Sequence, residues 1–86
     1  MLILGADDVR RLAPMPKLIA SLREAFRSES VVPPREVTKM PGGAGERLLL
    51  AMPAFDSSGS GIVKLATVVP DNRAAGLPTI QGVIIL

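Results

Sequence analysis

Two basic residues stand where a cation could meet an anionic ligand. Lys64 lies in the run 62–69, which is otherwise almost wholly apolar. A charged amine is costly to bury without a partner, so this lysine either reaches water from an edge strand or meets an anion. Arg35 follows Pro33-Pro34, and its planar guanidinium suits a carboxylate better than an ammonium does. Taken alone, each residue is most simply interpreted as an exposed basic residue on a strand. If their strands lie close together, the two would form a carboxylate-binding pair.

Other candidate motifs carry less chemistry. The stretch Gly42-Gly43-Ala44-Gly45 superficially suggests a phosphate loop, but it lacks the Gly-Lys-Ser/Thr ending, and the chain contains no G-x-G-x-x-G. We therefore expect a hairpin turn there. Taken alone, Met52 reads as core filler, and Thr79 and Gln81 read as ordinary polar residues on one side of a strand.

The composition excludes several functions. The chain has no Cys and no His, which excludes disulfides, the usual zinc sites and a His-based triad, so no metal is expected. Its formal charge of +2 comes from scattered residues and its aromatic content is 2%, so nucleic-acid binding has no support. No run approaches the ~20 apolar residues of a membrane span, and the apolar start lacks a basic flank. We expect a cytoplasmic protein.

The first part of the chain predicts short helices. Leu2 to Leu4 could form a strand, and 7–12 reads as a helical turn with acidic residues at its start. Pro14 and Pro16 open a longer helix, where proline costs least. Its apolar residues follow the i, i+3, i+4, i+7 spacing of one buried stripe: Met15, Leu18, Ile19, Leu22, Ala25 and Phe26.

The rest of the chain predicts strands at 35–40, 47–53, 62–69 and 79–86, separated by turns rich in Gly, Pro, Asp and Asn. Consecutive strands joined by short turns are most simply antiparallel neighbours, which predicts an α+β fold with the helix packed on a mostly antiparallel sheet. Strand alternation puts Lys64 on one face with Ile62, Ala66 and Val68. Because the sequence stops inside an apolar strand, we expect either a truncated parent chain or a partner that covers this strand.

The chain resembles the N-terminal part of ornithine cyclodeaminase/mu-crystallin family proteins along all 86 residues. The resemblance rests on the order and spacing of several blocks, of which Val63 to Asn72 is the strongest. They are Met1-Leu2-Ile3-Leu4, Leu22-Arg23-Glu24-Ala25-Phe26, Pro33-Pro34-Arg35, Pro41-Gly42-Gly43, Leu48 to Ala54, Val63 to Asn72, and Gly76 to Gly82.

The resemblance implies a two-domain enzyme, of which residues 1–86 are the N-terminal part of a substrate-binding, dimer-forming domain. The Rossmann domain that holds NAD or NADP is absent from this chain. The chemistry implied is hydride transfer at the α carbon of a small amino or imino acid, in a cytoplasmic homodimer. A non-enzymatic ligand-binding or dimerisation module on the same scaffold is the alternative.

The resemblance also implies roles for four residues. Arg35 and Lys64 would hold the substrate carboxylate, on neighbouring strands and turned toward one cleft; Met52 would line the pocket; and Thr79 would lie near the nicotinamide. The family's catalytic aspartate has no counterpart here, so we expect no catalytic residue in this chain. Family members that act on ornithine carry a glutamate two residues before this methionine, and here that residue is Leu50. This departure argues against ornithine and makes a small or apolar amino or imino acid an equal choice.

Overall fold

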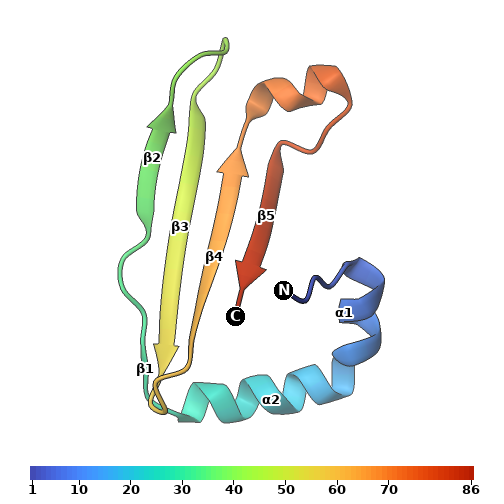
Figure 1. The fold of residues 1–86 in the computed structure, drawn as a ribbon, viewed down its shortest axis with the longest axis vertical. Helices are drawn as coiled ribbons and strands as arrows, with labels where there is room; N and C mark the ends of the chain where they lie inside the picture. The colour runs from blue at the N-terminus through green and yellow to red at the C-terminus, as the bar shows by residue number, and fades with distance from the viewer.

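The computed structural model describes residues 1–86 as two helices followed by an antiparallel sheet (Figure 1). The fold is therefore α+β, as the sequence predicts. The elements, in chain order, are α1 (Ala6–Leu12), α2 (Met15–Arg27), β1 (Ser30–Val31), β2 (Glu36–Met40), β3 (Arg47–Asp56), β4 (Gly61–Val68), the 3-10 helix η1 (Pro70–Ala75) and β5 (Ile80–Ile85).

The helices begin where their sequences favour a helix start. Asp8 in the first turn of α1 accepts a hydrogen bond from the Gly5 N–H at 3.0 Å, which satisfies one of the free donors of a helix N-terminus. Pro14 precedes α2, and Pro16 lies within its first turn. The strand expected at Leu2 to Leu4 does not form: these residues carry no regular structure, because no neighbouring strand offers them backbone partners.

The sheet is a meander in which each strand from β2 to β5 pairs with the next one, always antiparallel. The short β1, which the sequence does not predict, pairs with the far end of β3 at Phe55 and Asp56. Only short connections separate β2, β3 and β4, because the turns contain Gly42, Gly43 and Gly59, all at positive φ, where glycine costs least. The expected antiparallel order of the four main strands is confirmed.

The two faces of the sheet follow from this register, because directly opposed residues in antiparallel strands point to the same side. We call them the Lys64 face and the Leu65 face. The Lys64 face contains Val37, Lys39, Leu48, Leu50, Met52, Ala54, Asp56, Ile62, Lys64, Ala66, Val68, Ile80, Gly82 and Ile84. The Leu65 face contains Glu36, Thr38, Met40, Arg47, Leu49, Ala51, Pro53, Phe55, Gly61, Val63, Leu65, Thr67, Gln81, Val83 and Ile85.

Neither face of the sheet is covered. In Figure 1, α2 runs below the lower end of the sheet and α1 turns back up beyond β5, and none of the helix residues is buried, so the apolar stripe of α2 is uncovered. Ala66, at 5% exposure, is the one buried residue of the chain. The helix therefore does not pack on a face of the sheet as expected: Ser28 and Glu29 lead directly from the end of α2 to β1 at the end of the sheet, and α2 lies below the strand ends.

The uncovered faces give the molecule an open shape. Its accessible surface is 7190 Å², whereas a compact protein of its mass would expose about 4,900 Å². Its radius of gyration is 15.9 Å, against about 12 Å for a compact chain of this length. No helix is long and apolar enough to cross a membrane.

Candidate carboxylate-binding site

Three of the four predicted site residues lie in one row across the sheet. Met52 of β3 and Lys64 of β4 are direct cross-strand partners. Arg35 lies one residue before β2, and Glu36, the first residue of β2, pairs with Ala51. Extending the β2–β3 register by one residue would put Arg35 opposite Met52, although the pairing itself begins at Glu36. We call Arg35, Met52 and Lys64 the cationic row: Met52 and Lys64 share the Lys64 face, and Arg35 precedes the strand next to Met52.

The two cations are not on neighbouring strands, which corrects one expectation from the sequence. β3 separates β2 from β4, and two strand spacings amount to about 10 Å. Met52 occupies the position between the cations. A carboxylate that both cations contact would therefore lie above this methionine.

Both cations of the row are available to a ligand. The side chains of Arg35 and Lys64 belong to exposed residues, and the five ion pairs of the chain all involve other basic residues. The apolar residues around Lys64 in the sequence suggest that it is buried. In the structure it is exposed, because both sheet faces are open. An unpaired, exposed ammonium and an unpaired, exposed guanidinium both attract anions, and the guanidinium adds a bidentate fork.

Prolines break the hydrogen-bond ladder beside Arg35. Pro33 and Pro34 lie in the link between β1 and β2 and have no N–H to donate. On the other side of the gap, Pro53 lies in the part of β3 that pairs with neither β1 nor β2. Arg35 is therefore carried by a segment outside the ladder, whereas Lys64 is held between two paired strands.

Thr79, the fourth predicted residue, lies away from the row. Its carbonyl accepts a hydrogen bond from the Val69 N–H at 2.8 Å, which places it opposite the end of β4. Lys64 pairs with Ile84, five residues from Thr79, a separation of about 16 Å along the strand. Alternation also puts Thr79 on the Leu65 face, where Thr67 and Gln81 border a depression of 250 Å³. The sheet therefore stands between Thr79 and the cationic row.

The glycine-rich turn forms a hairpin, as predicted, and its apparent anion site is filled by the chain itself. The Ala44 N–H donates to Asp71 Oδ2 at 3.1 Å, and Arg47 Nη2 donates to the same oxygen at 3.5 Å. Gly43, at φ +80°, packs so closely on Arg47 and Asp71 that a Cβ would clash with both. Sequence reasoning missed this tie because Asp71 lies 27 residues from Ala44, and an Asp in a Pro-Asp-Asn turn is ordinary on its own.

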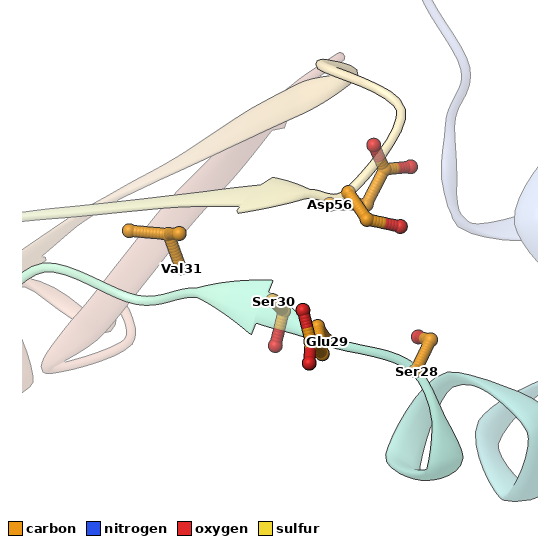
Figure 2. Close-up of a pocket in the computed structure, with 6 residues that line it drawn as sticks. Ser28, Glu29, Ser30, Val31 and Asp56 are labelled. Carbon is orange, nitrogen blue, oxygen red and sulfur yellow. The ribbon is translucent and has the colours of Figure 1, made fainter.

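A second depression, of 520 Å³, lies between the end of α2 and the end of β3 (Figure 2). Its lining includes Glu29 and Asp56, but no cation. The Asp56 carboxylate is already used by the following loop, because it accepts hydrogen bonds from Ser58 and Ser60. No group of three or more acidic residues could hold a metal ion, so this depression offers no metal centre.

The chain is similar over its whole length to Delta(1)-pyrroline-2-carboxylate reductase from Bacillus cereus, with 31% identity over 91 residues. The match spans 27% of the length of that reductase. No protein-family profile matches the chain, and no solved structure gives a significant match. The similarity supports a relationship to an enzyme of oxidoreductase type in amino-acid metabolism.

Proposed function

We propose that this chain is the N-terminal part of the substrate-binding domain of an ornithine cyclodeaminase/mu-crystallin family enzyme. The activity that we assign to the whole enzyme is NAD(P)-dependent deamination of an amino acid or reduction of an imino acid, in the cytoplasm. In this proposal the residues described here bind and orient the substrate, while the hydride donor is held elsewhere.

One observation carries the proposal: the cationic row occurs in a chain that is similar along its whole length to a reductase named for a 2-carboxylate. The Arg35 guanidinium would fork onto the two carboxylate oxygens, and Lys64 would supply a point charge. Met52 would press against the carbon atoms next to the carboxylate. Binding at three points fixes the position of the α carbon, which is where hydride transfer must occur.

The residues of this chain do not fit a dinucleotide by themselves. The glycine-rich turn is closed by Asp71, an anion that would repel a phosphate, and no other glycine cluster opens a helix. Thr79 lies across the sheet from the cationic row, so its contact with the nicotinamide is implied by the family resemblance alone.

The alternative is a dimerisation or ligand-binding module without catalysis, and the exposed surface favours a partner in either case. The chain exposes roughly 2,300 Å² more than a compact protein of its mass, and an obligate interface covers about 1,000–2,500 Å² on each partner. The open outer edge of β5 and the apolar Leu65 face would supply this interface, which leaves the Lys64 face open to substrate. We therefore include a homodimer through this domain in the proposal.

A chimera tests the enzymatic proposal. Residues 1–86 would replace the matching segment of the Bacillus cereus reductase, and oxidation of NADH or NADPH would be followed with Δ1-pyrroline-2-carboxylate as substrate. We expect substrate-dependent oxidation by the chimera and none by the 86-residue chain alone. A chimera that folds, as judged by circular dichroism and elution volume, but does not oxidise either cofactor would refute the enzymatic reading and favour the module without catalysis.

A further inference from the structure

The register adds a fourth residue to the cationic row. Ile84 of β5 is the direct cross-strand partner of Lys64, on the side away from Met52. The Cβ atoms of such partners lie about 4.5–5.5 Å apart. Lys64 is therefore flanked by Met52 and Ile84, and all three side chains stand on the Lys64 face.

The surroundings of Ile84 leave its side chain free to touch a ligand. Ile84 is 59% exposed, so it is not held in a core. The next cross-strand pair on the same face is Ala66 with Gly82, and neither has a side chain large enough to cover Ile84. A ligand body held at Lys64 could therefore extend over this pair while resting against the isoleucine.

The charges on this face limit what such a body can be. Two carboxylates reach the Lys64 face: Glu46, which is paired with Lys39 at 3.0 Å, and Asp56 of β3, which is nearer to the row. Asp56 lies four residues along β3 from Met52, about 13 Å away, and Ser58 and Ser60 occupy it. A substrate with a second ammonium group would find no carboxylate near the row, whereas an uncharged apolar body would meet Met52 and Ile84.

We propose that Ile84 is a specificity-determining residue, which selects carboxylates with an uncharged, apolar body, such as a five-membered ring, over those that carry an amine. This inference rests on the proposed function, because it takes the cationic row to be the carboxylate site. Ile84 contacts the body of the substrate, while Arg35 and Lys64 hold its carboxylate.

The test measures binding of stable probes to the 86-residue chain by NMR titration, and repeats it in the chimera by inhibition of the reductase reaction. The probes are pyrrole-2-carboxylate, acetate and ornithine. We expect pyrrole-2-carboxylate to bind more tightly than ornithine. Ile84→Ala should weaken pyrrole-2-carboxylate roughly tenfold, the scale of a few lost methyl and methylene contacts in an apolar pocket, and leave acetate unchanged. Ile85→Ala is the matched control, because Ile85 is the next residue of β5 but lies on the Leu65 face.

A second variant keeps the test informative if the shortened side chain of Ile84→Ala disturbs the sheet. Ile84→Glu places a carboxylate beside Lys64 and should reverse the preference from pyrrole-2-carboxylate to ornithine. If Ile84→Ala weakens acetate and pyrrole-2-carboxylate equally, or acts no differently from Ile85→Ala, Ile84 has only a structural role and the inference is wrong. If no carboxylate binds to the chain or the chimera, and Lys64→Ala changes nothing, the carboxylate site itself is wrong, and the proposed function fails with it.

Discussion

Met52 of β3 and Lys64 of β4 are direct cross-strand partners, and Arg35 immediately precedes Glu36, whose partner Ala51 is the residue before Met52. A methionine thus separates the two cations of the row, and the sheet fixes their spacing. This relationship turns two unremarkable basic residues into a single candidate site, and it determines what each substitution should do.

Removing either cation should weaken substrate use in the chimera. A hydrogen bond to a charged group contributes about 1.5–3 kcal/mol, so Lys64→Ala should lower kcat/KM at least tenfold. Arg35→Lys should also be harmful, because an ammonium cannot reproduce the guanidinium fork. Lys39→Ala is the control: Lys39 shares the face but already pairs with Glu46 at 3.0 Å. Near-normal kcat/KM in either row variant would remove that residue from the site.

Thr79 should affect the cofactor and not the carboxylate. The family resemblance assigns Thr79 to the nicotinamide, so Thr79→Ala in the chimera should raise the KM for NADH or NADPH. Because the sheet lies between Thr79 and the cationic row, the substrate KM should stay unchanged. Lys64→Ala should show the reverse pattern. Steady-state kinetics with each reactant varied in turn would measure this split. A rise of both KM values in Thr79→Ala would mean that the residue supports the fold and does not contact the cofactor.

The isolated chain should associate. Both faces of its sheet are open, and Val83 to Ile85 form an exposed apolar edge strand, which is a template for pairing with another chain. Light scattering coupled to chromatography at micromolar concentration should give a dimer or a larger species. Ile85→Lys should shift the distribution toward monomer, since charge on an edge strand opposes pairing. A sharp monomeric peak for the unaltered chain would contradict the expectation.

The tie between the glycine turn and η1 should depend on Gly43. The Cβ of an alanine there would clash with Arg47 and Asp71. The alanine backbone would also have to keep a positive φ, which costs about 1–2 kcal/mol. Gly43→Ala should therefore displace Asp71 and accelerate hydrogen exchange of the Ala44 amide. Gly59→Ala provides the control, because Gly59 has the same sign of φ but no atom within 4 Å of a Cβ. Equal exchange at Ala44 in both variants would show that the tie is not formed.

Acidification should release the loop after β3. The hydrogen bond from the Ser58 hydroxyl, with smaller help from the Ser60, Ser58 and Gly59 amides, lowers the pKa of Asp56 below its ordinary value. A lowered pKa means that the ionised carboxylate stabilises the loop at neutral pH, and this support is lost as the pH falls through the lowered pKa. NMR titration of the Asp56 carboxyl group should show the low pKa, and Ser58→Ala should raise it. Titration of Asp56 in the usual aspartate range would contradict the prediction.

Local patterns account for most of the fold that sequence reasoning predicted. Apolar alternation and glycine turns predicted the strands around Met52 and Lys64, and helical spacing from Met15 to Phe26 predicted α2. The strand at Leu2 to Leu4 was wrong, because an apolar run is a strand only where another strand pairs with it. β1 was not predicted for the opposite reason. Ser30 and Val31 have no strand-like sequence pattern, and they form a strand only because they pair with β3.

The site was harder to predict than the fold because it depends on register. Alternation placed Lys64 on its face correctly, but it could not show that β3 separates Lys64 from Arg35. The tie from Asp71 to Ala44 and the partnership of Lys64 with Ile84 link residues that are 27 and 20 positions apart. Nothing in either residue's own neighbourhood indicates such a contact.

The meander described above also sets the order in which the site can assemble. Met52 meets Lys64 when the four-residue loop 57–60 closes, a hairpin event on the scale of about 1–10 μs. Arg35 joins through the six residues 41–46, whereas Ile84 must wait for the eleven residues 69–79 that include η1, and longer loops cost more entropy to close. We therefore expect the strands that carry the two cations to pair before β5 brings in Ile84, the residue that would discriminate among carboxylates.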